Sequence, residues 1–204
     1  MVRRTKEEAG KTRNRILMSA LDTFMEKGYS STTLTDIAER IGMTRGAFYW
    51  HFKDKRDVML SLAKSMESRG NLKIQEKVST FSELEDVRKL FVEYARLHVE
   101  DKALARFYYV LTFRTEWNSE LMEVRDYFQE QQREFIGFVA EVLEHSLPEA
   151  QRNKLDLIEV ATALYVMVDG LIMNAFNSEN VDKLPRQVSD AVGIYIAGMM
   201  FQAL

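Results

Sequence analysis

Residues 33–55, TLTDIAERIGMTRGAFYWHFKDK, contain the pattern that decides the fold. Thr33 has the side chain of a helix N-cap, and apolar residues then recur at helical spacing up to Ile41. Gly42 suits the left-handed conformation that ends a helix, and Thr44 caps a second helix two residues later. Two short helices joined by so tight a turn indicate a helix-turn-helix, whose second helix enters the major groove of DNA.

The second helix is predicted to run from Arg45 to His51 and to be the recognition helix. The first residues of such a helix reach base edges, so Arg45 is expected to form a bidentate contact with guanine, and Thr44 to meet a base or a phosphate. Ala47 and Phe48 are apolar and lie on the opposite side of the helix. They are therefore expected to anchor it to the core.

An aromatic and basic segment follows the predicted recognition helix. Tyr49, Trp50 and His51 each carry a group that can donate a hydrogen bond to a phosphate oxygen, which fixes the register of a protein on DNA. Asp54 is placed to cap the next helix. The alternative is that the aromatic side chains only pack and the lysines only face solvent. The predicted DNA-binding residues are Thr33, Thr44, Arg45, Gly46, Tyr49, Trp50, His51, Lys53 and Lys55.

GMTRGAFYWHFKDKRDV, residues 42–58, resembles the DNA-binding signature of the TetR family of bacterial transcriptional repressors. Residues 12–41 are similar to the first two helices of that family, and residues 3–17 are most similar to its multidrug-efflux repressors. The strong resemblance covers roughly residues 10–60. It implies an all-α fold of about nine helices. A three-helix DNA-binding domain is expected over residues 1–53, and a larger helical domain for ligand binding and dimerisation over residues 54–204.

The composition is typical of a soluble helical protein. Two prolines and nine glycines among 204 residues favour helices, and the absence of cysteine excludes disulfides and thiolate metal sites. No metal site and no cofactor are predicted. The N-terminal residues have no apolar core and so do not form a secretory signal, which suits a cytoplasmic protein.

Positive charge gathers at the predicted helix-turn-helix. Residues 1–60 hold 12 Lys and Arg against 8 Asp and Glu, whereas the whole chain has a net charge of −3. A basic segment of this kind is the electrostatic pattern expected of a DNA-binding region.

Other helices are expected along the chain. Arg3, Arg4 and Lys6 form a polar N-terminal arm that either reaches an adjacent minor groove or has no role. The segment Ser82–Glu85 has the form of a capping box, and Leu147-Pro148 ends a long helix. The expected helices cover residues 12–27, 55–79 with a bend at Gly70 and Asn71, from 82 past 98, 104–115, 118–145, 157–176 and 185–204.

Residues 157–176, LIEVATALYVMVDGLIMNAF, are apolar on nearly every side, as in a buried helix or a membrane span. Glu159, Asp169 and Asn174 argue against a membrane. The helix is therefore expected to pack on the core with one face and on a second subunit with the other. In the TetR family the two final helices form the dimer interface, and a homodimer is expected here. The small residues of the last helix, which would let another helix approach closely, are Gly193, Ala197 and Gly198.

The resemblance also implies an inducer cavity in the C-terminal domain. An aromatic-lined cavity with few polar groups suits a small hydrophobic or aromatic ligand. Asp169 lies amid apolar residues, so it is expected to bind a cationic ligand, to cap a partner helix, or to pair with Arg96 or Arg114. The alternative is that the candidate side chains only pack against one another. The candidate ligand residues are Tyr94, His98, Phe107, Leu111, Trp117, Phe135, Phe138, Tyr165, Asp169, Ile172, Met173 and Phe176.

The leading hypothesis is a dimeric repressor that binds a palindromic operator in double-stranded DNA and leaves it when an inducer binds, with an efflux system as the suggested target. Two recognition helices related by a two-fold axis read half-sites about 34–36 Å apart, or a multiple of this distance. An enzyme with an accessory DNA-binding domain is one alternative, but the chain has no GxSxG, Walker or HExxH pattern. A ligand-independent architectural DNA-binding protein is the other.

Overall fold

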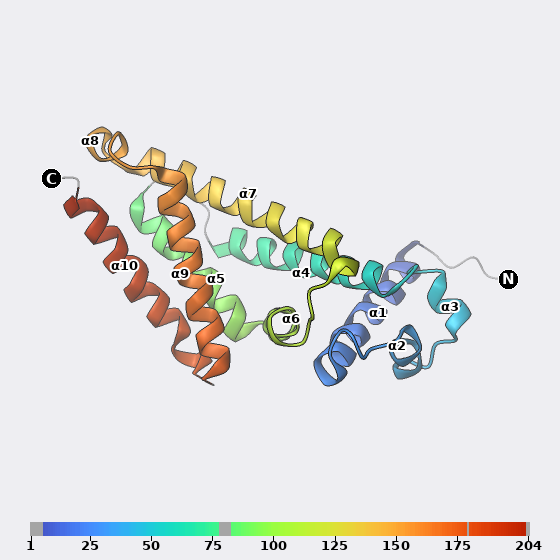
Figure 1. The fold of residues 1–204 in the computed structure, drawn as a ribbon. Helices are drawn as coiled ribbons and strands as arrows, with labels where there is room; N and C mark the ends of the chain where they lie inside the picture. Colours follow the sequence, from blue (N-terminus) through green and yellow to red (C-terminus); the bar gives the residue numbers. More distant parts are fainter. Residues whose placement is uncertain (1–5, 78–82, 179, 203–204) are drawn as a thin grey trace. The chain divides into compact units, whose positions relative to one another are not determined.

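The computed structural model describes residues 6–77, 83–178 and 180–202, and within these ranges the chain forms ten α-helices and two 3₁₀ helices without a β-strand (Figure 1). The predicted all-α fold is confirmed. The helices are α1 (Lys6–Lys27), α2 (Leu34–Arg40), α3 (Arg45–Tyr49), α4 (Lys55–Lys77), α5 (Leu84–Glu100), α6 (Lys102–Phe113), η1 (Ser119–Leu121), α7 (Met122–Ser146), α8 (Glu149–Arg152), α9 (Leu157–Asn177), η2 (Val181–Lys183) and α10 (Leu184–Gln202).

The chain divides into two compact units, which are described separately. The first unit contains Met1–Ser68 and Arg106–Asp126, and the second contains Arg69–Ala105 and Tyr127–Leu204. The boundaries fall inside α4, α6 and α7, so each of these helices contributes residues to both units. The functional division at residue 53 that the sequence suggests stays a prediction.

The first unit is built around α1, α2, α3 and the first part of α4. Its apolar residues recur at helical spacing, and Ile16, Phe24 and Phe48 are buried. Burying one such side chain contributes about 1.5–3 kcal/mol, which offsets the poor intrinsic stability of helices as short as α2 and α3. Tyr29, just after α1, packs its ring near Phe24, and its backbone N–H donates to the carbonyl oxygen of Arg114 at 2.8 Å.

The second unit is a helical bundle in which α5, α9 and α10 pack against one another. Its core contains Phe91 of α5 and Leu164 of α9, both buried. Gly193 of α10 faces α5, because a Cβ atom at this position would lie 3.7 Å from Arg88 Cδ. The close approach of another helix predicted at Gly193 is thus made by α5 of the same chain, and a contact of Gly193 with a second subunit stays a prediction.

A buried carboxylate joins α4 to the start of α6 within the second unit. Asp101 Oδ1 accepts the backbone N–H groups of Ala103 at 3.0 Å and Leu104 at 3.2 Å, which caps α6. Its Oδ2 lies 2.6 Å from both Arg69 Nε and Lys73 Nζ. Burial raises the pKa of Asp101, but the hydrogen bonds from Lys73 and Arg69 prevail and hold this pKa at about 2.

Several helix boundaries differ from those predicted. α1 begins at Lys6 rather than at residue 12, with acidic residues in its first turn, where they favour a helix N-terminus. The predicted capping box at Ser82–Glu85 is wrong in register, because Glu83 is the N-cap and its N–H donates to Asp86 Oδ2 at 3.0 Å. α4 runs as one helix through Gly70. The described ranges do not include Arg3, Arg4 or Ser82. They also do not include residue 79, the predicted end of α4.

The end of the long helix α7 and the start of α4 agree with the sequence. Pro148 follows α7 as predicted, although the short helix α8 after it is not predicted by the pattern. Asp54 Oδ1 accepts the N–H of Asp57 at 2.7 Å, which confirms Asp54 as the cap of α4. Local capping signals therefore place these boundaries correctly.

α9 is the one helix in the described residues that is long and apolar enough to cross a membrane by length and composition. The core helix of a soluble protein passes the same test, so this is weak evidence for a membrane span. Buried and exposed apolar residues lie on different sides of the helix. Leu164, Val168 and Ile172 are buried, whereas Ile158 and Val166 are exposed. α9 thus packs on its own unit with one face only.

Candidate nucleic-acid interface

The helix-turn-helix consists of α2, a turn at Gly42 and α3. Thr33 Oγ1 accepts the N–H of Asp36 at 3.1 Å, and the Asp36 carboxylate accepts the N–H of Thr33 at 2.8 Å, which forms a capping box at the start of α2. Gly42 has a φ of +65°, a conformation that side chains with a Cβ rarely adopt. The N–H of Met43 donates to the carbonyl oxygen of Ala38 at 2.9 Å and closes the turn, which fixes the point at which α3 begins.

α3 has a capped start and one buried side. Thr44 Oγ1 accepts the N–H of Ala47 at 3.3 Å. Phe48 is buried, and its ring centroid lies 5.8 Å from that of the buried Phe52, so the inward side of α3 is the one predicted. The helix ends at Tyr49, two residues before the predicted end at His51.

The opposite side of α3 is exposed. Arg45 is exposed and Tyr49 is 45% exposed, and Arg45 Nη2 donates to the hydroxyl of Tyr49 at 3.3 Å. Gly46 lies beside them with no atom within 4 Å of a Cβ position. The face that would meet a DNA groove therefore carries the guanidinium of Arg45 and the phenol of Tyr49, with open space beside them at Gly46.

The exposed surface continues past the end of α3. Trp50 is 90% exposed, which is unusual for the largest apolar side chain in proteins. Lys53 is also exposed, and its backbone N–H is held by Asp57 Oδ2 at 3.0 Å. His51 is half-buried, and its carbonyl oxygen accepts a hydrogen bond from Arg13. The indole of Trp50 and the ammonium of Lys53 thus extend the candidate surface.

Lys55 differs from the other predicted DNA contacts. Its ammonium donates to the carbonyl oxygens of Tyr29 at 2.8 Å and Ser30 at 3.2 Å, and lies 4.3 Å from the centroid of the Tyr29 ring. Burial lowers the pKa of Lys55, and the negative charge of Glu120 acts in the opposite direction. A contact between Lys55 and a phosphate would have to compete with these carbonyl groups.

Five of the predicted ligand residues lie together in the second unit. The ring centroid of Tyr94 lies 5.0 Å from that of His98 and 5.8 Å from that of Phe135, which in turn lies 6.0 Å from that of Tyr165. Burial, followed by the negative charge of Asp169, raises the pKa of Tyr165 to about 12, while a hydrogen bond with Tyr94 acts in the opposite direction. We call Tyr94, His98, Phe135, Tyr165 and Asp169 the aromatic cluster.

His98 is the most buried titratable group of the aromatic cluster. Its Nδ1 lies 2.9 Å from the carbonyl oxygen of Tyr94, which can only accept, so the neutral ring carries its proton on Nδ1. Burial lowers the pKa of His98 to about 4, against the opposing effect of this hydrogen bond. The ring is therefore neutral at physiological pH.

The other ligand candidates differ in unit and in exposure. Phe107, Leu111 and Trp117 belong to the first unit, where Trp117 Nε1 donates to the carbonyl oxygen of Leu111 at 3.3 Å. Arg96, one predicted partner of Asp169, lies within 4 Å of the carboxylates of Glu93 and Glu100 on its own helix. The ligand contacts stay predictions. The remaining candidates in the second unit range from buried to exposed and are Ile172, Phe176, Phe138 and Met173.

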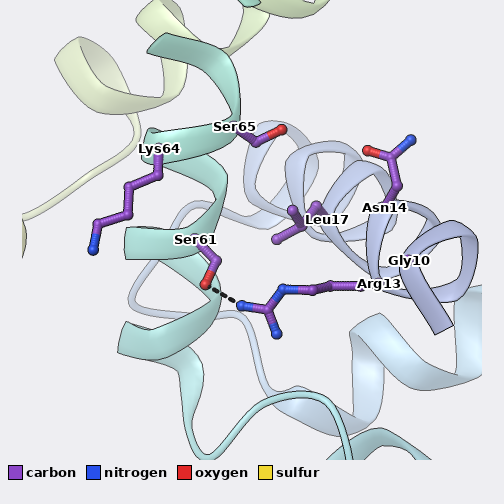
Figure 2. Close-up of a pocket in the computed structure, with 7 residues that line it drawn as sticks. All are labelled: Gly10, Arg13, Asn14, Leu17, Ser61, Lys64 and Ser65. Atoms are coloured by element: carbon purple, nitrogen blue, oxygen red, sulfur yellow. Dashed lines mark hydrogen bonds between the residues drawn. The ribbon is translucent and has the colours of Figure 1, made fainter. Parts of the chain in front are cut away.

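A hollow of about 350 Å³ lies in the first unit, between α1 and α4 (Figure 2). It is not the cavity predicted for the C-terminal region, which stays a prediction. Arg13 at its edge reaches the end of α3, although no local pattern in the sequence singles this residue out. The residues that line the hollow are Gly10, Arg13, Asn14, Leu17, Ser61, Lys64 and Ser65.

Known proteins resemble this chain in both sequence and fold. Residues 16–62 match the family model of the bacterial regulatory proteins of the tetR family. The probable HTH-type transcriptional regulator ArpR of Pseudomonas putida is 34% identical over 175 residues, which cover 84% of this chain and 83% of ArpR. The match to ArpR therefore extends well beyond the helix-turn-helix.

Two solved structures share the fold. NalD, the secondary repressor of the MexAB-OprM multidrug efflux pump in Pseudomonas aeruginosa, has a TM-score of 0.75 and 23% identity, covering 92% of this chain and 97% of NalD. SmeT in complex with triclosan has a TM-score of 0.76 and 23% identity, covering 92% of this chain and 91% of SmeT. The arrangement of an N-terminal helix-turn-helix followed by a helical region is thus common to all three.

Proposed function

The chain belongs to the TetR family of bacterial regulatory proteins, and from this membership we propose that it is a dimeric repressor that binds a palindromic operator and is released by a small hydrophobic inducer. Its relatives are named as transcriptional regulators and not as enzymes. Regulation of transcription through DNA binding is therefore the class of function, and the dimer, the operator symmetry and the inducer are the proposal.

The observation that carries the proposal is the exposed side of α3. Arg45 and Tyr49 project from a helix whose other side is buried through Phe48, and Trp50 extends the same surface. A guanidinium can read guanine in the major groove, while phenol and indole groups can donate to phosphates. We propose this surface, with Thr44, as the DNA contact.

A second copy of this chain is the proposed occupant of the apolar surface on α9 and α10. Val166, Ile194 and Phe201 are 57%, 73% and 75% exposed. Large apolar side chains left in water are costly, and their burial stabilises by roughly 25 cal/mol per Å². Gly198 leaves open space where a Cβ would stand, so a partner helix has room to approach closely.

The aromatic cluster is the proposed inducer site. Its rings offer apolar contact, and the phenol groups of Tyr94 and Tyr165 together with Asp169 offer a few polar contacts. SmeT holds triclosan, so a protein with this fold can take up an aromatic compound. An inducer must bind the DNA-incompetent state more tightly, because only a difference in affinity shifts the equilibrium.

An efflux operon is the proposed target, and the cytoplasm is the proposed location. The N-terminal residues are most similar to multidrug-efflux repressors, and NalD, which shares the fold, represses an efflux pump. A repressor that senses a pump's own substrates would raise export only when those compounds are present.

The test uses the purified full chain and duplexes that it selects from a random-sequence pool. The selected sequences are expected to be palindromic, with half-sites about one helical turn apart or a multiple of it. A matched duplex with one half-site moved by about five base pairs, half a helical turn, should bind far more weakly, because only one recognition helix can then engage. Uniform coating of DNA without a symmetric site would contradict the proposal.

The inducer is sought by a thermal-shift screen of hydrophobic cations, fatty acyl compounds and aromatic drugs. A compound that binds the folded protein raises its melting temperature, and an inducer must also weaken binding to the selected duplex. A strongly stabilising compound that leaves operator affinity unchanged is not an inducer.

A further inference from the structure

Arg13, on α1, connects three elements of the first unit. Its Nη1 donates to the carbonyl oxygen of His51 at 2.7 Å, just past the end of α3. Its Nη2 donates to Ser61 Oγ on α4 at 2.6 Å (Figure 2). Its guanidinium carbon lies 4.1 Å from the centroid of the buried Phe52 ring. One side chain thus joins α1, α4 and the turn that follows the recognition helix.

Asp57 completes the attachment of this turn to α4. Ser61 Oγ donates to Asp57 Oδ1 at 3.4 Å, and Asp57 Oδ2 accepts the backbone N–H of Lys53 at 3.0 Å. The turn is therefore held at two backbone groups, the carbonyl of His51 and the N–H of Lys53. The carbonyl of His51 is tied to Ser61 through Arg13, and the N–H of Lys53 is tied directly to Asp57. Asp57 and Ser61 lie one helical turn apart on α4.

α3 needs such external support because it has only five residues. A helix this short is unstable alone, and its last carbonyl groups have no partner within the helix. Thr44 caps its start, and the carbonyl oxygen of the buried Phe48 accepts the N–H groups of His51 at 2.9 Å and Phe52 at 3.3 Å. The far end of α3 is thus tied to the turn, and Arg13 ties that turn to α1 and α4. Hydrogen bonds weaken steeply as their angles change, so a small shift of that end would misalign Tyr49 and Arg45 on DNA.

We infer that Arg13 is a positioning residue that fixes α3 against α1 and α4, and thereby sets the discrimination between operator and other DNA without itself contacting DNA. The inference rests on the proposed function, because it assigns a role in reading the operator. It adds a residue from α1, outside the helix-turn-helix, to those that determine specificity.

The hollow beside Arg13 defines the competing explanation. Lys64 and Asn14 line it together with Arg13, so a DNA phosphate seated there would make Arg13 a direct phosphate contact. Two guanidinium nitrogens of Arg13 already donate to His51 and Ser61, which favours positioning. Salt dependence separates the two explanations, because each neutralised phosphate adds about 0.9 to the slope of log K against log salt concentration.

The experiment compares the wild type with Arg13→Met, which keeps an unbranched apolar stem, and with Arg15→Met as the control. Arg15 is exposed on the same helix, and its contact with the carbonyl of Ile41 is 3.5 Å long, so the control removes the same charge. The probes are the duplex selected by the wild type and a scrambled duplex of equal length and composition. Arg13→Met is expected to lower the operator-to-scrambled affinity ratio about tenfold, a difference of about 1.4 kcal/mol between the two duplexes, with an unchanged salt slope.

Three further variants keep the test decisive if Arg13→Met does not fold. Arg13→Lys retains the charge but cannot form the forked pair of hydrogen bonds, so it should lower the ratio as Arg13→Met does and leave scrambled-DNA binding unchanged. Ser61→Ala should lower the ratio by roughly threefold. The ratio of the double variant Arg13→Lys/Ser61→Ala should fall by less than the two single effects combined, because both substitutions remove the same hydrogen bond.

Three results would overturn the inference. A salt slope smaller by about two in the Arg13→Met dimer, from one lost phosphate contact in each subunit, would identify a phosphate contact. Equal losses of affinity for both duplexes in Arg13→Met would show that Arg13 only stabilises the fold. An unchanged ratio in Arg13→Lys and Ser61→Ala would show that Arg13 has no role in specificity. A wild type that does not prefer its selected duplex would refute the proposed function instead, so the two failures are distinguishable.

Discussion

Arg45 and Tyr49 stand one helical turn apart on the exposed side of α3, with Arg45 Nη2 donating to the Tyr49 hydroxyl at 3.3 Å. The guanidinium carbon of Arg45 also lies 5.6 Å from the centroid of the Tyr49 ring. Each side chain therefore limits the rotamers of the other before DNA arrives. Reduced rotamer freedom in the free protein lowers the entropy lost on binding, so the pair is partly organised for its proposed target.

Tyr49→Ala is expected to abolish measurable operator binding, while Tyr49→Phe should lose about tenfold. The phenylalanine keeps the ring that packs beside Arg45 but lacks the hydroxyl that donates to a phosphate, a loss of about 0.7 kcal/mol in each subunit and about 1.4 kcal/mol for the dimer. Titration of the selected duplex by fluorescence anisotropy checks the order. Circular dichroism and sedimentation should show unchanged helix content and dimer, because Tyr49 is exposed. Retained affinity in Tyr49→Ala would show that α3 is not the recognition helix.

Arg45→Lys is expected to flatten sequence preference at one base pair in each half-site. A lysine is a point donor and cannot match the two acceptors of guanine in the way that a guanidinium does, a difference of about 1–3 kcal/mol. The measurement is a panel of duplexes with single-base substitutions. Arg40→Lys is the control, because Arg40 forms two 2.8 Å hydrogen bonds with Glu26 and is not expected at the DNA. A uniform loss across the panel would assign Arg45 to a phosphate.

The helix-turn-helix is predictable from sequence because its signals are local. The N-cap at Thr33, the glycine at position 42 and the cap at Thr44 each act within four residues, and the structure confirms all three. The buried side of α3 follows equally from Phe48 and its helical spacing. The same local reasoning fails at Ser82–Glu85, because the adjacent Glu85 and Asp86 offer alternative registers, and Glu83 with Asp86 forms the capping box.

Contacts between distant residues are not predictable in this way. Arg13 meets partners 38 and 48 residues away, and Asp101 meets Arg69 32 residues away. No pattern in a single sequence pairs such residues, because many surface cations have equivalent local surroundings. Lys55 is an example. Its position in the sequence suggests a phosphate contact, whereas its ammonium donates to two carbonyl groups of the turn after α1.

Gly198→Glu is expected to shift the protein from dimer to monomer and to weaken operator binding in parallel. A glutamate there would place an unpaired charge between apolar helices of two copies, which costs several kcal/mol when buried. Sedimentation velocity over a range of concentrations checks this outcome. Gly137→Glu is the control, since Gly137 is also a helical glycine with no atom within 4 Å of a Cβ position. An unchanged dimer in Gly198→Glu would place the interface elsewhere.

His98 is expected to make the protein less stable as the pH falls. Burial, against the opposing hydrogen bond to Tyr94, lowers the pKa of His98 to about 4, whereas an unfolded histidine titrates near 6.5. The unfolded state then binds more protons between these two values, so the stability contributed by the neutral ring is fully present above about pH 6.5 and is lost as the pH falls toward 4. From about pH 7.5 to about pH 5 the expected loss from this residue is about 2 kcal/mol.

Urea unfolding of the wild type, His98→Gln and His145→Gln at these two pH values isolates the effect. His145 is the matched control, because its Nδ1 also contacts a carbonyl one helical turn earlier, that of Glu141 at 2.7 Å, but its ring is exposed. His98→Gln should lose most of the pH-dependent difference in unfolding free energy, whatever its absolute stability, because glutamine does not titrate. His145→Gln should keep that difference. Equal pH dependence in all three proteins would mean that His98 reaches solvent in the folded state, and a ring that does so cannot belong to a closed aromatic cluster.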